Sequence, residues 1–319
     1  MSVLDYYRAQ VFNPLSITGA TPFLWCEVDR GTTFSGDGIA AGTTPPVVTI
    51  TGVNSPTFPT IKVRIPAGGA RGTATYETSY DGVLWSTAAA TLASVVVGPF
   101  TINFPVGTYA TDNTYDANPQ TLADMTAQLN HLSAIAATGP LIVPNALGGR
   151  AGFTAAAAGY FRRAVLTGAR VVSGPMTIIV VGVSDVTPAA AILAGGVDFM
   201  RDLRCDGSGN IALVASASAA LSPTAALSAS KAFMASGNWD GASSGGQLRQ
   251  QGLPPITGTC NPAEPAPILL SSMGFGANAA GTWACVGYQM CAVFACDGLL
   301  SAAELAYLRD GFAHRYSIL

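Results

Sequence analysis

Charged side chains are scarce in this chain of 319 residues. Only 10% of the residues are charged, whereas about a quarter is usual in soluble domains. Lysine occurs only at Lys62 and Lys231. The net charge of −3 comes without a basic cluster, which argues against nucleic-acid binding, since phosphate backbones are bound by lysine and arginine. So little charge predicts a surface that touches other protein, although an alanine-rich genome explains the alanine content alone equally well.

Long apolar runs are also missing. No stretch approaches the ~18 apolar residues of a membrane-spanning helix, and the beginning of the chain, Met1-Ser-Val-Leu-Asp5, has no signal-peptide pattern. We therefore expect that the protein folds in a cytoplasm and does not insert into a membrane.

Residues with metal-binding or redox spacing are absent as well. The six cysteines include no C-x-x-C pair, and the two histidines, His131 and His314, are far apart in sequence. We expect no zinc site, no cofactor and no obligatory disulfide. Asp206-x-Ser208-x-Asn210 alternates oxygen-bearing residues but lacks the glycine and glutamate of a calcium loop, so a hairpin turn explains it better; calcium binding is left open.

Hydrophobic patterns predict an all-β protein. Met176–Val183 is a continuous apolar, β-branched run and indicates a central strand. Phe199–Cys205 and Ile211–Ala215, joined by a turn, predict a hairpin. One helix is expected at Thr121–Leu132, where apolar residues recur at helical spacing, with Thr121 as N-cap and Asp124 in the first turn.

The end of the chain predicts a buried strand followed by a helix. The stretch from Trp283 to Asp297 is apolar on both faces. Ser301 and Glu304 have the spacing of a capping box. The helix that follows carries Leu305, Leu308 and Phe312 on one stripe, which indicates packing against a sheet.

Several motifs follow one another in a particular order. They are Leu24-Trp25…Asp29, Asn145…Arg150…Phe153, Trp239-Asp240-Gly241, Gly287-Tyr288 and Leu300-Ser301-x-x-Glu304. This order resembles the concanavalin A-like lectin and glucanase sandwiches of the laminin-G-like kind, over roughly residues 141–319. The resemblance implies a jelly-roll sandwich with a short C-terminal helix. One departure is Met290-Cys-Ala-Val293, where members often carry a glutamate.

The residues before this region show a different hydrophobic pattern. Five short alternating runs, separated by turn signals, predict a small β-sandwich: Val47–Val53, Ile61–Ile65, Ala74–Ser79, Ala93–Val97 and Phe100–Phe104. Two of its stretches, Ser79-x-Asp81-Gly82…Trp85 and Phe104-x-x-Gly107-Thr108-Tyr109…Thr114-Tyr115, resemble β-sandwich modules of tailed-phage structural proteins. We therefore expect an N-terminal arm and first strand in residues 1–44, an inserted small β-sandwich in 45–117, and the main jelly roll in 118–319.

Carboxylates are too few for the glucanase arrangement that the resemblance suggests. Glu27-Val28-Asp29 places two acids on one face of a strand, but Gly31 stands where a third would be. No G-x-S-x-G motif occurs. We therefore expect that the protein is not an enzyme.

These observations predict a virion structural protein of a tailed phage or phage-like particle, as a decoration, fibre or spike component. It would fold in the host cytoplasm, assemble with other capsid or tail proteins or with further copies of itself, and present a lectin-like domain to host-surface glycan. The candidate glycan-binding residues are Trp239, Asp240, Trp283 and Tyr288. Tyr160 is a further aromatic candidate, and core packing is the alternative for the aromatic residues. Two other functions stay open: a free carbohydrate-binding or glycan-cleaving protein, and a purely structural module.

Overall fold

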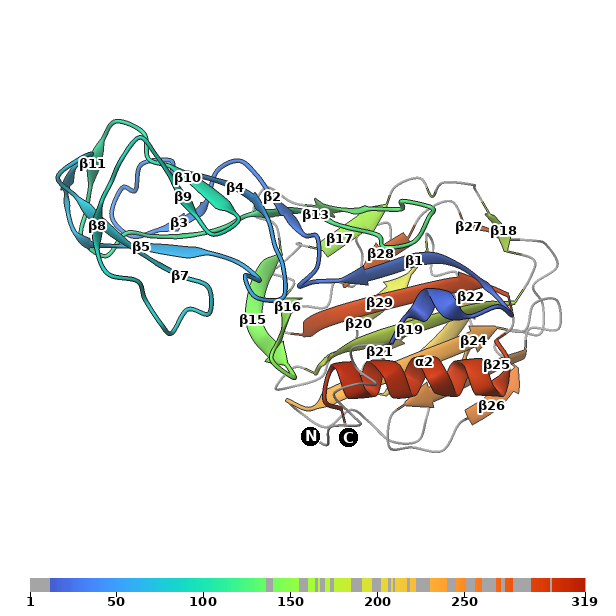
Figure 1. Ribbon diagram of the computed structural model, residues 1–319. Helices are drawn as coiled ribbons and strands as arrows, with labels where there is room; N and C mark the ends of the chain where they lie inside the picture. The colour runs from blue at the N-terminus through green and yellow to red at the C-terminus, as the bar shows by residue number, and fades with distance from the viewer. Residues whose placement is uncertain are drawn as a thin grey trace.

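The fold consists of a main sandwich and a smaller β-lobe that projects from one end of it (Figure 1). The computed structural model describes residues 12–135, 140–154, 160–163, 166, 170–172, 175–184, 191–196, 202–205, 208, 210–216, 219–221, 230–239, 245–250, 256–259, 268–270, 273–277, 288–298 and 300–318. We call residues 45–117 the insert. Among the described residues the elements are strands, one short 3-10 helix, η1 (Pro14–Ser16), and one α-helix, α2 (Ala302–Arg315).

One sheet of the main sandwich, the helix-side sheet, has eight strands. Its path is β15 (Leu141–Leu147), β16 (Arg150–Thr154), β29 (Gln289–Asp297), β19 (Met176–Val183), β24 (Ala232–Trp239), β25 (Gly245–Gln250) and β26 (Ile256–Thr259). The remaining strand, β1 (Thr21–Glu27), pairs with β29 on the same edge as β16, farther along the strand.

The opposing sheet, the long sheet, continues from the main sandwich into the insert and has twelve strands. Its order is β23 (Ala219–Leu221), β22 (Ile211–Ser216), β21 (Asp202–Cys205), β20 (Ala191–Gly195), β28 (Met273–Phe275), β17 (Tyr160–Arg163), β14 (Leu132–Ile135), β13 (Pro119–Leu122), β2 (Thr33–Phe34), β4 (Thr49–Val53), β10 (Phe100–Asn103) and β9 (Ser94–Val97).

The insert forms a sandwich with a third sheet, the insert sheet, to which β3 contributes from the segment before residue 45 that was predicted as part of the N-terminal arm and first strand. Its order is β3 (Ile39–Ala41), β12 (Thr114–Asp116), β5 (Lys62–Ala67), β7 (Thr75–Ser79) and β8 (Ala89–Ala90). Two short pairs complete the described strands: β6 (Gly69–Ala70) with β11 (Thr108–Tyr109), and β18 (Arg170–Val172) with β27 (Ile268–Leu270). The all-β fold class with a C-terminal helix is therefore confirmed.

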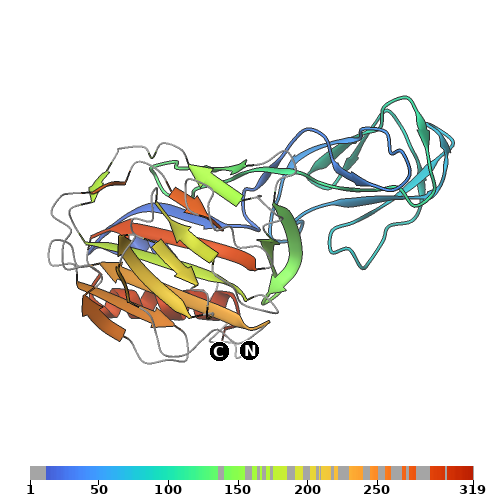
Figure 2. The same ribbon diagram turned by 180° about the vertical axis from the view of Figure 1, so that it is seen from behind.

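β19 and β29 are central strands, as their sequences predict. They pair antiparallel along their whole lengths, and both are buried on both faces. Alternate side chains such as Ile178 and Val293 face the long sheet, whereas Ile179 and Phe294 face the helix. The helix lies in front of the strands in Figure 1 and behind them in Figure 2, so three layers follow one another: α2, the helix-side sheet and the long sheet.

The terminal helix begins where the sequence predicts. Ser301 accepts the backbone N–H of Glu304, and Glu304 accepts that of Ser301, which completes the capping box. Leu305, Leu308 and Phe312 are buried against the sheet. The segment before β1 lies over the helix, with the ring of Phe12 5.0 Å from that of Phe312.

The predicted helix at Thr121–Leu132 is wrong. β13 ends at Leu122, a loop follows, and β14 begins at Leu132. The carboxylate of Asp124 accepts the backbone N–H groups of Thr126 and Asn130 within the loop and that of Trp25 in β1. Side-chain bonds of this kind offer the backbone an alternative to a helix, and here the loop is bonded to a strand about a hundred residues away.

The insert is joined to the main sandwich by buried polar contacts as well as by the long sheet. Asn54 donates from Nδ2 to the carbonyl of Val28 at 2.8 Å and accepts the N–H of Thr32 at 2.8 Å. Apolar residues of both lobes belong to one continuous buried cluster, which includes Ile50 and Phe100 of the insert and Phe153 of the main sandwich. This junction gives the insert a fixed orientation.

Candidate functional site

Two of the predicted glycan-binding residues lie in the protein core. Trp239, at the end of β24, is 0% exposed, and Tyr288, just before β29, is 1% exposed. Trp239 pairs with Met176 at the start of β19, so its ring enters the space between the sheets. In this fold neither ring reaches a sugar at the surface, and Tyr160 is buried as well. Asp240 and Trp283 lie outside the described residues and stay predictions.

The two acids of Glu27-Val28-Asp29 belong to a buried cluster of charged groups. Glu27 is 0% exposed and contacts Arg315 of α2, Arg30 at 3.3 Å and Arg150 at 3.4 Å. The indole Nε1 of Trp25 donates to the same carboxylate at 3.1 Å.

Asp29 shares one of these arginines. Its Oδ2 lies 2.7 Å from Nη1 of Arg150. Burial raises the pKa of Asp29, and the positive charge of Arg150 opposes that rise. Burial also raises the pKa of Tyr316, whose ring lies under the guanidinium of Arg150. The cluster thus joins β1, the β15–β16 turn and the end of α2.

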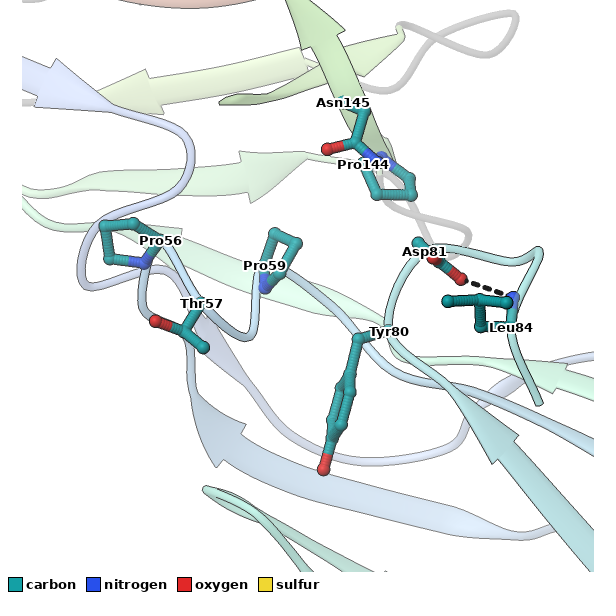
Figure 3. A pocket seen from close by; sticks show the side chains of 8 residues that line it. All are labelled: Pro56, Thr57, Pro59, Tyr80, Asp81, Leu84, Pro144 and Asn145. Atoms are coloured by element: carbon teal, nitrogen blue, oxygen red, sulfur yellow. Dashed lines mark hydrogen bonds between the residues drawn. The ribbon is translucent and has the colours of Figure 1, made fainter. Parts of the chain in front are cut away.

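A shallow cavity of about 330 Å³ lies between the insert and the main sandwich. Pro56, Thr57 and Pro59 come from the loop after β4, whereas Pro144 and Asn145 come from β15 (Figure 3). The other lining residues, Tyr80, Asp81 and Leu84, follow β7. Three of the eight lining residues are prolines and four, Thr57, Tyr80, Asp81 and Asn145, carry polar side chains, so the cavity offers both polar and apolar contacts.

The turn beside this cavity is held by its own side chains. Asp81 Oδ1 accepts the N–H groups of Val83 and Leu84, both at 2.8 Å, and the hydroxyl of Ser79 at 2.9 Å. These bonds lower the pKa of Asp81. The turn therefore holds the backbone of Val83 and Leu84 in a fixed position. Their side chains point to solvent and are 75% and 76% exposed.

Exposed apolar side chains gather on the insert. Seven of the ten large hydrophobic residues that stand exposed in the described part of the chain belong to it: Val47, Val53, Val83, Leu84, Leu92, Val96 and Val106. No charged residue occurs between Asp81 and Asp112.

Among the described residues, no group of acids, histidines and cysteines is arranged to hold a metal ion. No helix in the described part of the chain is long and apolar enough to cross a membrane.

Comparisons with known proteins give similar folds at low identity. No family model matches the chain, and no curated protein does. A solved structure of a GH54 α-L-arabinofuranosidase has 12% identity and a TM-score of 0.48, with 80% of this chain and 63% of that chain covered. A Trypanosoma rangeli sialidase has 17% identity, a TM-score of 0.40 and coverages of 59% and 30%. The binding domain of botulinum neurotoxin serotype D has 13% identity, a TM-score of 0.45 and coverages of 60% and 49%.

These matches correct one expectation. The prediction that the protein is not an enzyme is contradicted, because glycosidases stand among the solved structures that the chain resembles. The chain spans less than two thirds of the length of those enzymes.

Sequence reasoning missed the arginines that meet Glu27 and Asp29. Arg150 is 123 residues from Glu27 and Arg315 is 288 residues away, and no local pattern reports such a pairing. The apolar surface of the insert did leave a signal, namely the uncharged stretch from Gly82 to Thr111.

Proposed function

We propose that the protein is a structural component of a phage-like virion, attached through the insert and presenting the main sandwich to host-surface glycan. The observation that carries the proposal is the gathering of exposed apolar side chains on the insert. Val83, Leu84, Val96 and Val106 are each at least 75% exposed. Burying one valine or leucine contributes roughly 1.5–3 kcal/mol, so contact with another protein that covers several of them stabilises an assembly.

The junction supports the same role. An insert that attaches to a particle can hold the main sandwich at a set angle only if the two lobes do not swing. The long sheet runs without a break from β9 of the insert to β23 of the main sandwich. The bonds of Asn54 to Val28 and Thr32 fix the crossing segment between β1 and β4.

Composition and motifs also favour a virion component. The 10% of charged residues leaves little freely solvated surface. The Asp81 turn, whose sequence resembles phage β-sandwich modules, is the segment that presents Val83 and Leu84. Glycan is proposed as the ligand of the main sandwich on the resemblance to lectin-like sandwiches, with Asp240 and Trp283 as candidate contacts.

Sedimentation of particles tests the attachment. The chain should pellet with purified particles in a fixed copy number set by capsid or tail symmetry. A chain found only in the soluble part of the lysate would overturn the proposal.

A glycan array and a polysaccharide digest test the ligand. Binding to a defined glycan without release of sugar supports presentation to the host surface. Release of sugar would favour a glycan-cleaving protein, and no binding by a chain that the particle still needs would favour a purely structural module.

A further inference from the structure

β9 is an edge strand of the long sheet that lacks the usual protection of sheet edges. It pairs with β10 on one side, and in the described part of the chain no strand pairs with its other side. Natural proteins guard such edges with charged residues, proline or bulges. Ser94-Val-Val-Val97 has no charged residue and no proline, and its register with β10 has no shift.

The backbone groups that face the open side can be assigned. Phe104 donates its N–H to the carbonyl of Ala93, so Ala93 belongs to a hydrogen-bonded pair with β10. Such pairs recur at every second residue of an antiparallel ladder, which makes Val95 and Val97 the next ones. Ser94 and Val96 therefore direct their N–H and C=O groups away from β10.

β8, β9 and the residues that join them carry no charge, and Arg71 at the Ala93 end of the edge is bonded through Nη1 to the carbonyl of Phe104 at 3.3 Å. β8 is the edge of the insert sheet, it precedes β9 by only a short connection, and Ala89 and Ala90 are exposed. Leu92 is 56% exposed and Val96 75% exposed. A charged partner surface would lose its hydration here without gaining an opposite charge, so the edge fits a partner surface that is itself uncharged.

We propose that β9 pairs antiparallel with β9 of a second copy of the chain. A two-fold axis at Val95 places Ser94 opposite Val96 of the second copy and Val96 opposite its Ser94. All four of these residues direct backbone groups to the open side, so the pairing satisfies both edges at once. A two-fold interface requires a self-complementary surface, and a strand with no charge and no bulge provides one.

The pairing joins the two long sheets into one continuous sheet. Val95 then lies opposite Val95 of the second copy, and on the outer face each Val96 side chain lies opposite Ser94 of the other copy. This proposal rests on the insert being the attachment lobe, but it concerns the purified chain alone and is tested without particles.

Sedimentation velocity of the purified full chain over a range of concentrations tests the pairing. The wild type should form dimers that dissociate on dilution. Val96→Lys places a charge on the edge, and Val96→Pro removes an N–H that faces away from β10. Both should weaken the dimer at least about tenfold, the factor that corresponds to ~1.4 kcal/mol. Leu129→Lys, at a leucine of the main sandwich that is 58% exposed, should leave the dimer unchanged.

Amide hydrogen exchange identifies the strand involved. The amides of Ser94 and Val96 should exchange more slowly in the wild-type dimer than in Val96→Lys, while that of Val95 should stay protected in both, which also shows that the variant is folded. A wild type that stays monomeric up to about 1 mM, which corresponds to a binding free energy of only ~4 kcal/mol, would overturn the proposal. So would a dimer that both Val96 variants leave intact. A monomeric wild type whose entry into particles is lost in Val96→Lys would assign the edge to a different virion protein.

Discussion

Arg315 in the last turn of α2 donates a hydrogen bond to the carboxylate of Glu27, which lies 288 residues earlier at the end of β1. Their side chains are 4% and 0% exposed. The pair therefore ties the first strand of the main sandwich to its last helix. Because charged groups are costly to bury unless they are paired, this contact makes the two ends of the fold depend on each other.

Replacing Arg315 with methionine should destabilise the protein strongly. Arg315→Met keeps an apolar stem beside Phe12 and Trp25 but leaves the carboxylate of Glu27 short of one partner. Removing one member of a buried ion pair costs about 3–5 kcal/mol, and chemical denaturation should show this loss in the free energy of unfolding. Lys62→Ala is the control, since Lys62 and Asp116 form a pair that is about one third exposed, and should cost no more than ~1 kcal/mol. Equal losses would contradict the account of the cluster.

Phe294 tests the position of β29 in the main sandwich. It is fully buried, its strand lies between β1 and β19, and its ring is 6.4 Å from that of Phe312. Phe294→Ala should lower the free energy of unfolding by roughly 3–5 kcal/mol. Ser301→Ala, which removes the helix cap, should cost about 1 kcal/mol. Similar small effects from both variants would mean that β29 is peripheral.

Glu304 should contribute to stability in a pH-dependent way. Its carboxylate accepts the N–H of Gly19 at 2.7 Å, the hydroxyl of Ser301 at 2.7 Å and the N–H of Thr18 at 2.9 Å, which lowers its pKa to about 2. Because the folded pKa lies below the ordinary value of 4.5, the stabilisation is present above that value and is lost as the pH falls toward 2. The difference in unfolding free energy between wild type and Glu304→Gln should shrink over that range. A difference that stays constant with pH would contradict this assignment.

Gly311 is predicted to leave room for Phe12. A Cβ at position 311 would lie 2.0 Å from Cδ2 of Phe12. Gly311→Ala should therefore destabilise the wild type, although alanine favours a helix by about 1 kcal/mol over glycine. In a Phe12→Ala background the same change should stabilise by about that amount. Stabilisation in both backgrounds would show that Phe12 does not pack there.

The elements that local patterns determine were predictable from the sequence. β19 and β29 are continuous apolar runs, and the capping box of Ser301 and Glu304 needs only a spacing of three residues. The error at Thr121–Leu132 has a physical reason, because Asp124 and Asn130 bond to the backbone of Trp25 and Phe23 in β1. A periodic pattern contains no information about such partners.

For the candidate site, too, local sequence patterns identified the residues, whereas their position depends on how distant strands pair. Trp239 was predicted as a glycan platform from its motif, but the pairing of β24 with β19 directs the ring into the core. The run Ala93–Val97 was predicted as a strand, yet only the strand order shows that β9 (Ser94–Val97) stands at an edge.

The most direct test of the proposed role is the copy number of variant chains in purified particles. Leu84→Lys places a charge on the apolar surface of the insert, at a side chain 76% exposed, and Leu129→Lys makes the same change at a side chain 58% exposed in the main sandwich. Quantitative mass spectrometry of the pelleted particles should find Leu129→Lys at the wild-type copy number and Leu84→Lys strongly depleted. A wild-type chain absent from the particles, or two variants incorporated equally well, would contradict attachment through the insert.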